Sequence, residues 1–172
     1  MWASVKQQYM LSQGACGYIY ETSEPDVVIK RMRRVRSKSH GAREQCRIQS
    51  KISQILCKGN GFNLLFAPKA WGATDKEYCM QRIDCSRPIE ILNNDIDGLN
   101  QELAIFYMKA MAYEIFPCDY ELYLQDDGRV ALVDFDKFGA WNSDGSVDMP
   151  WGETWTDDFV TAVVDHVLGN IL

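Results

Sequence analysis

Two short apolar runs in this sequence each lead directly into a charged residue. Residues 27–29 are β-branched and are followed by Lys30, and the apolar residues 130–133 are followed by Asp134. Runs of this length and composition predict buried strands. An aspartate that ends an apolar strand beside Phe135 is more typical of a functional site than of a turn. Lys30, taken alone, is more simply an ordinary lysine at a strand end.

The rest of the chain predicts further strands and helices. Small residues followed by alternating side chains indicate a hairpin over 10–20. Apolar residues recur at helical spacing over 42–56, before a glycine-rich stop, and a second helix is expected over 101–115, ended by Pro117. An Asp-Gly turn at 127–128 predicts a hairpin. The other expected elements are strands at 67–71 and 78–83, hairpin strands at 122–124 and 130–133, and a last helix at 155–172.

The composition is that of a folded domain with an uneven charge. At 172 residues, 47% of them hydrophobic, the chain is long enough for one domain or two small lobes and too apolar for a disordered segment. Residues 1–86 carry 14 lysines and arginines against 7 acidic residues, and residues 87–172 carry 4 against 17. A basic front half and an acidic back half are consistent with two lobes of complementary charge.

Signals for a membrane, for secretion or for a zinc site are weak. No apolar run is long enough to cross a bilayer, and residues 1–10 lack a signal-peptide pattern. The six cysteines are scattered, without a C-x-x-C pair, which favours reduced thiols over a zinc site. We therefore expect an intracellular protein, cytoplasmic or nuclear, without a membrane partner.

Four loosely specific motifs follow one another in a fixed order. Gly14 and Gly17 frame a turn, Lys30 ends a strand, Glu44 lies on the first helix, and Asp134 opens an Asp-Phe-Asp segment. Together they resemble the glycine-rich loop, strand lysine, helix glutamate and D-F-G segment of the protein-kinase-like superfamily. The resemblance covers about residues 11–138.

The resemblance implies a single α+β domain with a two-lobed protein-kinase-like fold. The N-lobe, about residues 1–86, would be a small sheet with a helix, and the C-lobe, about residues 87–172, would be truncated and helical. Only about 15 residues separate Asp134 from Pro150, so the activation segment would be short. Residues 157–159 resemble the aspartate-bearing helix of the large lobe, and we expect the peptide-recognition helices to be largely missing.

An ATP and magnesium site is implied as well. Lys30 would pair with the α- and β-phosphates, Glu44 would fix that lysine, and Asp134 would hold the metal ion. The turn at Gly14 and Gly17 would let backbone amides approach the phosphates. The implied base pocket has Met80 behind the base, Gln81, Arg82 and Ile83 offering backbone groups beside it, and Val28 and Tyr123 on its two faces.

The expected catalytic loop departs from the family pattern. In the family, H-R-D-x-x-x-x-N precedes a hairpin that ends on the metal aspartate. On that hairpin, Glu121 takes the place of the asparagine, Phe116 that of the catalytic base and Glu114 that of the histidine. Since phenylalanine cannot accept a proton, either catalysis is lost or Asp119 acts as the base in a shortened loop. Glu121 is still able to bind a divalent metal.

Two glycines of the family pattern are also replaced, by Ser12 in the first motif and by Asp136 in the last. Three functions follow from these departures. The favoured one is a pseudokinase that binds nucleotide or a protein partner. The alternative is a minimal ATP- and magnesium-dependent phosphotransferase using Asp119 or Glu121. A weaker third is a structural domain whose own side chains fill the pocket.

Two segments are candidate surfaces for a protein partner. The basic residues 30–38 are more simply a solvated connection, but they could instead dock an acidic surface of another molecule. The tryptophan-rich residues 141–155 are more simply part of the core, but they could form an exposed patch. The net charge of −6 argues against nucleic acid as the main partner.

Overall fold

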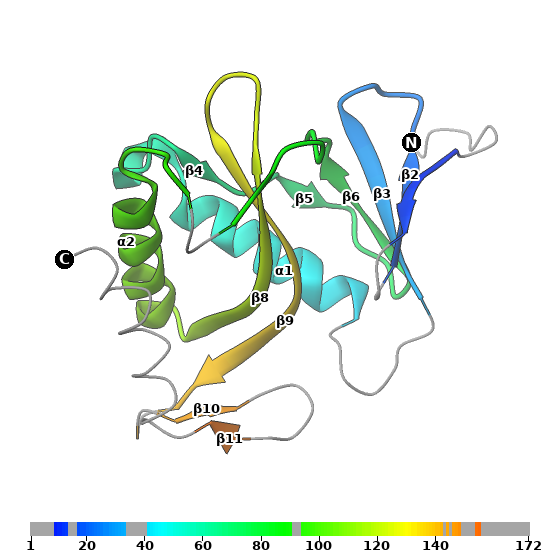
Figure 1. The fold of residues 1–172 in the computed structure, drawn as a ribbon. Coiled ribbons are helices and arrows are strands. Elements are labelled where there is room, and N and C mark those ends of the chain that lie inside the picture. The colour runs from blue at the N-terminus through cyan, green and yellow to red at the C-terminus, as the bar shows by residue number, and fades with distance from the viewer. Residues whose placement is uncertain are drawn as a thin grey trace.

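The computed structural model describes residues 9–13, 17–33, 41–90, 94–142, 144, 146–148 and 154–155. In this part of the chain the fold is α+β, with two mainly antiparallel sheets and two α-helices (Figure 1). The elements in chain order are β1 (Met10–Gln13), β2 (Gly17–Glu21), β3 (Val27–Met32), α1 (Ala42–Ile55), the short 3-10 helix η1 (Lys58–Asn60), β4 (Leu65–Phe66), β5 (Ala70–Trp71), β6 (Glu77–Gln81), β7 (Pro88–Ile89), α2 (Leu99–Ala112), β8 (Ile115–Leu124), β9 (Val130–Trp141), β10 (Val147–Asp148) and β11 (Thr154–Trp155).

The first sheet has the strand order β1-β2-β3-β6-β5, with every neighbouring pair antiparallel. Strand alternation places Val28 and Lys30 of β3 on the buried face, opposite Met80 and Tyr78 of β6. Helix α1 packs on this face through Cys46, which joins the cluster of Val28, Tyr78 and Met80. The sheet therefore buries one face against the first half of α1.

Gly17 allows strands β2 and β3 to approach closely. A Cβ atom at this position would lie 2.8 Å from the backbone oxygen of Arg31, which is too close for any larger residue without a backbone shift. Gly17 pairs with Met32 in the β2–β3 ladder. The glycine that the sequence assigns to a phosphate-binding turn is thus required by strand packing.

The second sheet is built on the long β8–β9 hairpin. Its strand order is β11-β10-β9-β8-β7, and β4 adds to β9 in parallel. The hairpin closes at a turn in which Gly128 has φ +81° and donates its N–H to the carbonyl of Gln125. That confirms the predicted hairpin, although both strands are much longer than expected.

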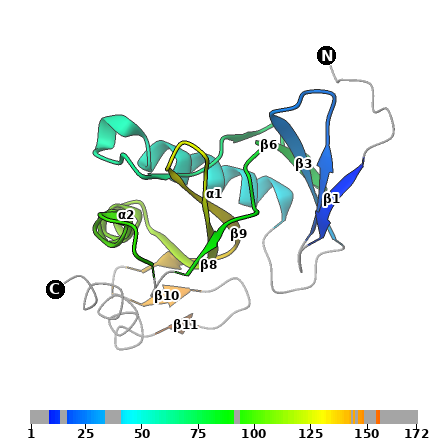
Figure 2. The ribbon, with the colours of Figure 1, turned by 45° about the horizontal axis from the view of Figure 1, so that its top comes forward.

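Helices α1 and α2 cover the β8–β9 hairpin and form the larger core. In both ribbon views the first sheet lies at one end and α2 at the other, with α1 and the hairpin between them (Figures 1 and 2). Residues from both helices and the hairpin share one cluster of buried side chains. Among them are Ile48 and Ile52 of α1, Leu103 and Phe106 of α2, and Leu122, Val130 and Leu132 of the hairpin.

A buried carboxylate ties α2 to the chain before β4. Glu102 accepts hydrogen bonds from the backbone N–H groups of Asn63, Leu64 and Leu65, at 2.8–3.1 Å, and is only 9% exposed. Burying a charged group costs free energy unless hydrogen bonds such as these replace its bonds to water. This interaction fixes the position of β4 at the edge of β9.

Several predicted elements are confirmed with shifted boundaries, and one predicted helix end is wrong. The expected helix at 42–56 is α1, and the expected strands at 67–71 and 78–83 shorten to β5 and β6. The expected helix at 101–115 instead ends at Ala112. Glu114 has φ 59°, and the buried Ile115 and Phe116 pair with β9, so tertiary pairing ends the helix before Pro117. The described part of the back half is therefore richer in strand than the expected helical lobe.

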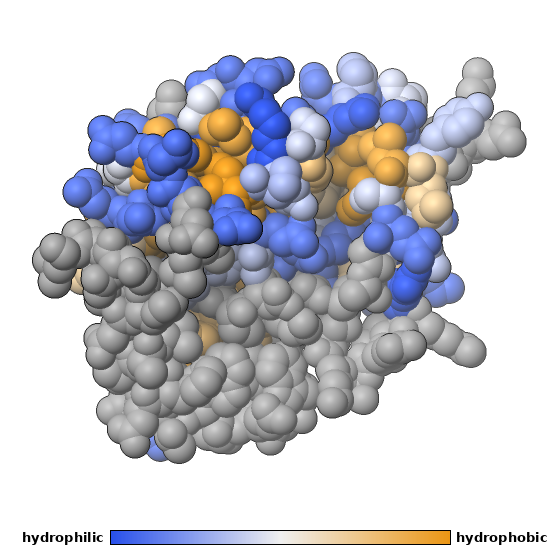
Figure 3. Space-filling model, in the orientation of Figure 1, coloured by the Kyte–Doolittle hydropathy of each residue, from blue (hydrophilic) through white to orange (hydrophobic). Residues whose placement is uncertain are grey.

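The surface on the face of Figure 1 has two apolar areas. One lies between α2 and the hairpin and the other beside β3 and β6, with hydrophilic side chains between them (Figure 3). Exposed large apolar side chains also occur on α2, including Met108, which is 65% exposed. No helix among the described residues is long and apolar enough to cross a membrane.

Candidate functional site

The two charged residues that end apolar strands form an ion pair between the two sheets. Lys30 Nζ lies 2.8 Å from Asp134 Oδ1 and donates a hydrogen bond to it. The Lys30 side chain is 10% exposed and that of Asp134 is 40% exposed. The fold thus brings together two residues that are 104 positions apart in the sequence.

Strand alternation explains why Lys30 points inward. It shares the buried face of β3 with Val28, and it lies opposite Tyr78 in the neighbouring strand β6. Burying an ammonium group costs free energy unless a counter-charge is close. Asp134 supplies that counter-charge while keeping part of its carboxylate open to solvent.

The backbone at Asp134 adopts an uncommon conformation. Its φ of 67° lies in the left-handed region, which residues other than glycine rarely occupy. The flanking Val133 and Phe135 are both buried, so the surrounding core holds Asp134 in this conformation. Backbone strain of this kind is concentrated at functional sites.

Tyr123 and Glu121 lie next to the ion pair on strand β8. The Tyr123 hydroxyl donates a hydrogen bond of 2.5 Å to Glu121 Oε2. Burial raises the pKa of Tyr123, and the bond to Glu121 and the negative charges of Glu121, Cys85 and Asp134 raise that pKa further. Glu121 also faces Val133, the residue before Asp134, in the β8–β9 ladder.

The connection between the two sheets passes beside this group. Asp84 and Gln125 exchange two hydrogen bonds, from Asp84 N to Gln125 Oε1 and from Gln125 Nε2 to the Asp84 carbonyl. Cys85 is exposed as a residue, but partial burial of its thiol raises the pKa of that group, and the charges of Glu121 and Asp84 add to the increase. The connection is therefore fixed to the end of the hairpin that carries Glu121 and Tyr123.

Several residues expected around the base pack against or hydrogen-bond to other parts of the protein. Val28 and Met80 face each other across β3 and β6 and are buried. The N–H groups of Gln81 and Arg82 donate to the carbonyls of Lys69 and Asp26. The N–H groups of Gln81 and Arg82 were expected to face the base, but both are already hydrogen-bonded within the protein. Ile83 lies beyond the end of β6 and is half-buried.

Glu44 is bound by a residue of its own helix. Arg47 donates from Nε and Nη2 to the two carboxylate oxygens, at 2.9 and 2.6 Å. Lys30 forms its ion pair with Asp134 and not with Glu44 among the described side chains. The expected pairing of Glu44 with Lys30 is not present in this conformation, and its role toward that lysine stays a prediction.

The segment expected to be a catalytic loop is a strand. Residues 116–121 all belong to β8, because Phe116 is fully buried and the strand pairs with β9 along its length. Asp119 lies opposite Lys137 between two irregularities of the ladder, and its side chain is outside the described part of the structure. The shortened loop proposed from the sequence is therefore wrong in its local structure.

The described part of the basic segment packs on the sheet. The guanidinium groups of Arg31 and Arg33 lie over the rings of Tyr20 and Tyr18, at 4.8 and 4.7 Å from the ring centroids.

Predicted features that fall outside the described residues are Gly14, the basic positions 34–38, Trp151, the segment 157–159 and the body of the last helix. Trp155, where that helix was expected to begin, belongs to strand β11 instead.

Two cavities lie apart from the ion pair. One, of about 330 Å³, is lined in part by Glu44, Glu114 and Asp148. The other, of about 510 Å³, is lined in part by Gln81 and Arg129. Neither cavity could be predicted from local patterns, because their walls come from several separated segments. Within the described residues, no group of three or more His, Cys, Asp or Glu side chains forms a metal site.

Comparisons of the sequence add no relative to this description. No protein-family model matches the chain, and no curated protein matches its sequence.

Proposed function

We propose that the chain is a kinase-like module that binds ATP with Mg²⁺ between its two sheets and has lost the catalytic loop. The first sheet with α1 would form the N-lobe, and the hairpin with α2 the reduced C-lobe. The observation that carries the proposal is the 2.8 Å pair of Lys30 and Asp134, one residue from each sheet.

The chemistry of this pair suits a magnesium nucleotide. A lysine ammonium binds phosphate oxygens, and a carboxylate that is partly open to solvent can bind Mg²⁺. Mg²⁺ takes one or two protein carboxylates and fills its other positions with phosphate oxygens and water. Asp134 would supply one of them, and Glu121 on the neighbouring strand is the candidate for a second.

A regulatory role is favoured over phosphoryl transfer. The position expected for the catalytic base holds Phe116, which lies in the core and contacts the ring of Tyr107. Glu44, expected to fix the lysine, is bound by Arg47. These two features support a pseudokinase that senses nucleotide or presents a surface to a protein partner.

Thermal unfolding with nucleotide tests the proposal. A ligand that binds only the folded state at about 100 times its Kd stabilises it by about 2.7 kcal/mol. For a chain of this length that corresponds to roughly 5–10 °C in Tm. The proposal predicts such a shift with ATP and Mg²⁺, and a smaller one with ATP alone. The absence of any shift at millimolar ATP would refute it.

Turnover separates the module from the alternative enzyme. We expect no ATP hydrolysis or phosphoryl transfer above that of an Asp134→Asn variant. Turnover that disappears in Asp119→Ala or Glu121→Ala, with folding intact by circular dichroism, would instead establish the minimal phosphotransferase.

A further inference from the structure

The 510 Å³ cavity lies beside β5, the edge strand of the first sheet, and neither Lys30 nor Asp134 lines it. Val27 and Gln81 are cross-strand partners and line the cavity, whereas Val28 and Met80, their neighbours in sequence, belong to the buried face. Because successive side chains of a strand point to opposite faces, Val27 and Gln81 point away from the face that carries Lys30. Its volume is in the range that holds small organic ligands.

One part of the cavity wall is cationic. Arg129 stacks over the ring of Phe66, with its Cζ atom 4.4 Å from the ring centroid, and its guanidinium forms an ion pair with Asp127 through Nε alone, at 2.7 Å. Lys69 is exposed, and its ammonium has no ion-pair partner among the described residues. Two positive groups with free hydrogen-bond donors thus border the same cavity.

The rest of the wall is aromatic and apolar. Trp71 is 43% exposed, although it is a large apolar side chain, and it lines the cavity with Phe66. Phe62 and Leu65 form a fully buried floor. Aromatic and apolar walls with a few polar groups are typical of small-molecule sites.

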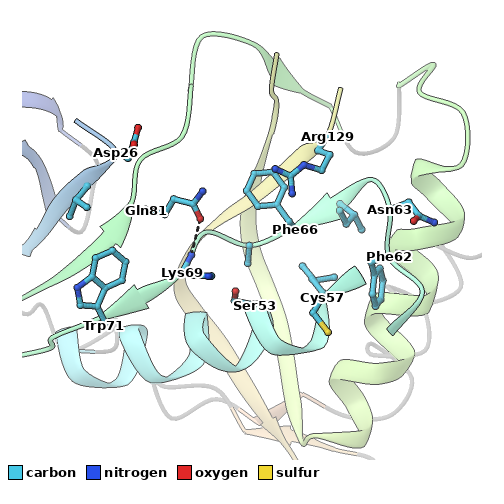
Figure 4. A pocket seen from close by; sticks show the side chains of 14 residues that line it. Asp26, Ser53, Cys57, Phe62, Asn63, Phe66, Lys69, Trp71, Gln81 and Arg129 are labelled. Carbon is cyan, nitrogen blue, oxygen red and sulfur yellow. Dashed lines mark hydrogen bonds between the residues drawn. The ribbon is translucent and has the colours of Figure 1, made fainter. Parts of the chain in front are cut away.

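The charged groups are distributed unevenly in this cavity. Asp26 and Trp71 lie at one end of the cavity, Arg129 and Phe66 lie at the other end, and Lys69 lies between them (Figure 4). An anion is therefore expected at the Lys69 and Arg129 end, away from Asp26. A ring attached to that anion would extend along Phe66 or toward Trp71.

We propose that this cavity binds a small aromatic anion, such as an aromatic carboxylate. The carboxylate would receive charge-assisted hydrogen bonds from Lys69 and Arg129. The ring would cover the exposed face of the aromatic wall and remove its apolar area from water. The anion-binding residues are separate from the ion pair, since neither Lys69 nor Arg129 lies there, although Gln81, expected from the sequence beside the base, also lines this cavity.

Cysteine protection provides a direct test, because Cys57 lines the cavity and is exposed. The probe is 2-naphthoate, and the readout is the alkylation rate of each cysteine by mass spectrometry. At about ten times its Kd, the probe should slow Cys57 about tenfold. Cys85 is also exposed but lies outside the cavity, so its own rate should not change.

Matched variants and ligands make the test specific. Lys69→Met should weaken naphthoate binding by about tenfold or more, while Lys76→Met, at an exposed lysine outside the cavity, should leave it unchanged. The neutral 2-naphthamide and the non-aromatic cyclohexanecarboxylate should each protect Cys57 less than naphthoate does.

Three results would overturn the proposal. They are no protection of Cys57 at millimolar naphthoate, equal protection by naphthamide, or equal effects of the Lys69 and Lys76 variants. The response of Tm to ATP should be the same in Lys69→Met and in the unaltered chain, so failure here is distinct from failure of the nucleotide proposal.

Discussion

Substitution of Glu102 by glutamine tests how α2 is held against the chain before β4. In the native chain the two carboxylate oxygens accept from the N–H groups of Asn63, Leu64 and Leu65, at 2.8–3.1 Å. A glutamine keeps one oxygen and replaces the other by an NH₂ group. That group is a donor, so it faces the N–H of either Asn63 or Leu65 without accepting from it.

The expected cost follows from these bonds. A buried N–H left without an acceptor costs about 1–3 kcal/mol, and the remaining bonds lose the contribution of the negative charge. We therefore expect Glu102→Gln to lower the free energy of unfolding by about 2–4 kcal/mol, measured by equilibrium unfolding in urea. Asp95→Asn, at an exposed carboxylate, is the control and should change it by less than about 0.5 kcal/mol.

The result that would refute this reasoning is a Glu102→Gln variant as stable as Asp95→Asn. It would mean that water or a rearranged loop satisfies the three N–H groups without the carboxylate. A full loss of folding in the glutamine variant would be tested again with Glu102→Asp, which keeps the charge on a shorter side chain.

Two other predictions concern local packing and high pH. Gly17→Ala should lower the free energy of unfolding by about 1–3 kcal/mol, because the added Cβ would meet the Arg31 backbone. Gly59→Ala is the control, because its Cβ would have no atom closer than 4.0 Å. Equal urea midpoints for the two variants would contradict this prediction. Burial raises the pKa of Tyr120 to about 12, while an unfolded tyrosine titrates near 10. The folded state favours the neutral hydroxyl, so the contribution of Tyr120 to the free energy of unfolding is complete below about pH 10. As the pH rises toward 12, that contribution of about 3 kcal/mol is lost. Alkaline unfolding of Tyr120→Phe should lack this component; identical pH profiles would contradict it.

Local patterns in the sequence predicted the elements that do not depend on distant partners. The spacing of Ile48, Ile52 and Ile55 was sufficient for α1, and the Asp-Gly turn was sufficient for the β8–β9 hairpin. Lys30 and Asp134 were each recognisable as charged ends of apolar strands. Their contact depends on how the two sheets are arranged, which no local pattern specifies.

The start of β8 shows where local patterns fail. Ile115 and Phe116 continue the apolar spacing of α2, and Pro117 is a usual helix stop, so a helix to 115 was reasonable. Pairing of these residues with Ala140 and Gly139 of β9 overrides that preference. Pro117 is tolerated because the ladder is already irregular just after it.

The cavity beside Gln81 could not be predicted for a related reason. Its wall combines the end of α1, the segment around β4, the edge strand β5 and the turn of the hairpin. Lys69 and Arg129 are unremarkable surface cations in the sequence, and they become a candidate site only when the fold places them on one wall with Phe66.

The central claim is that Lys30 and Asp134 form a magnesium-nucleotide site, and the most direct measurement is calorimetric titration of ATP with and without Mg²⁺. We expect binding that Mg²⁺ strengthens and that Lys30→Met and Asp134→Asn each weaken by about tenfold or more, whereas Lys76→Met should leave the affinity unchanged. Circular dichroism would verify that all three variants are folded. No binding at millimolar ATP, or binding that neither substitution nor Mg²⁺ alters, would contradict the account.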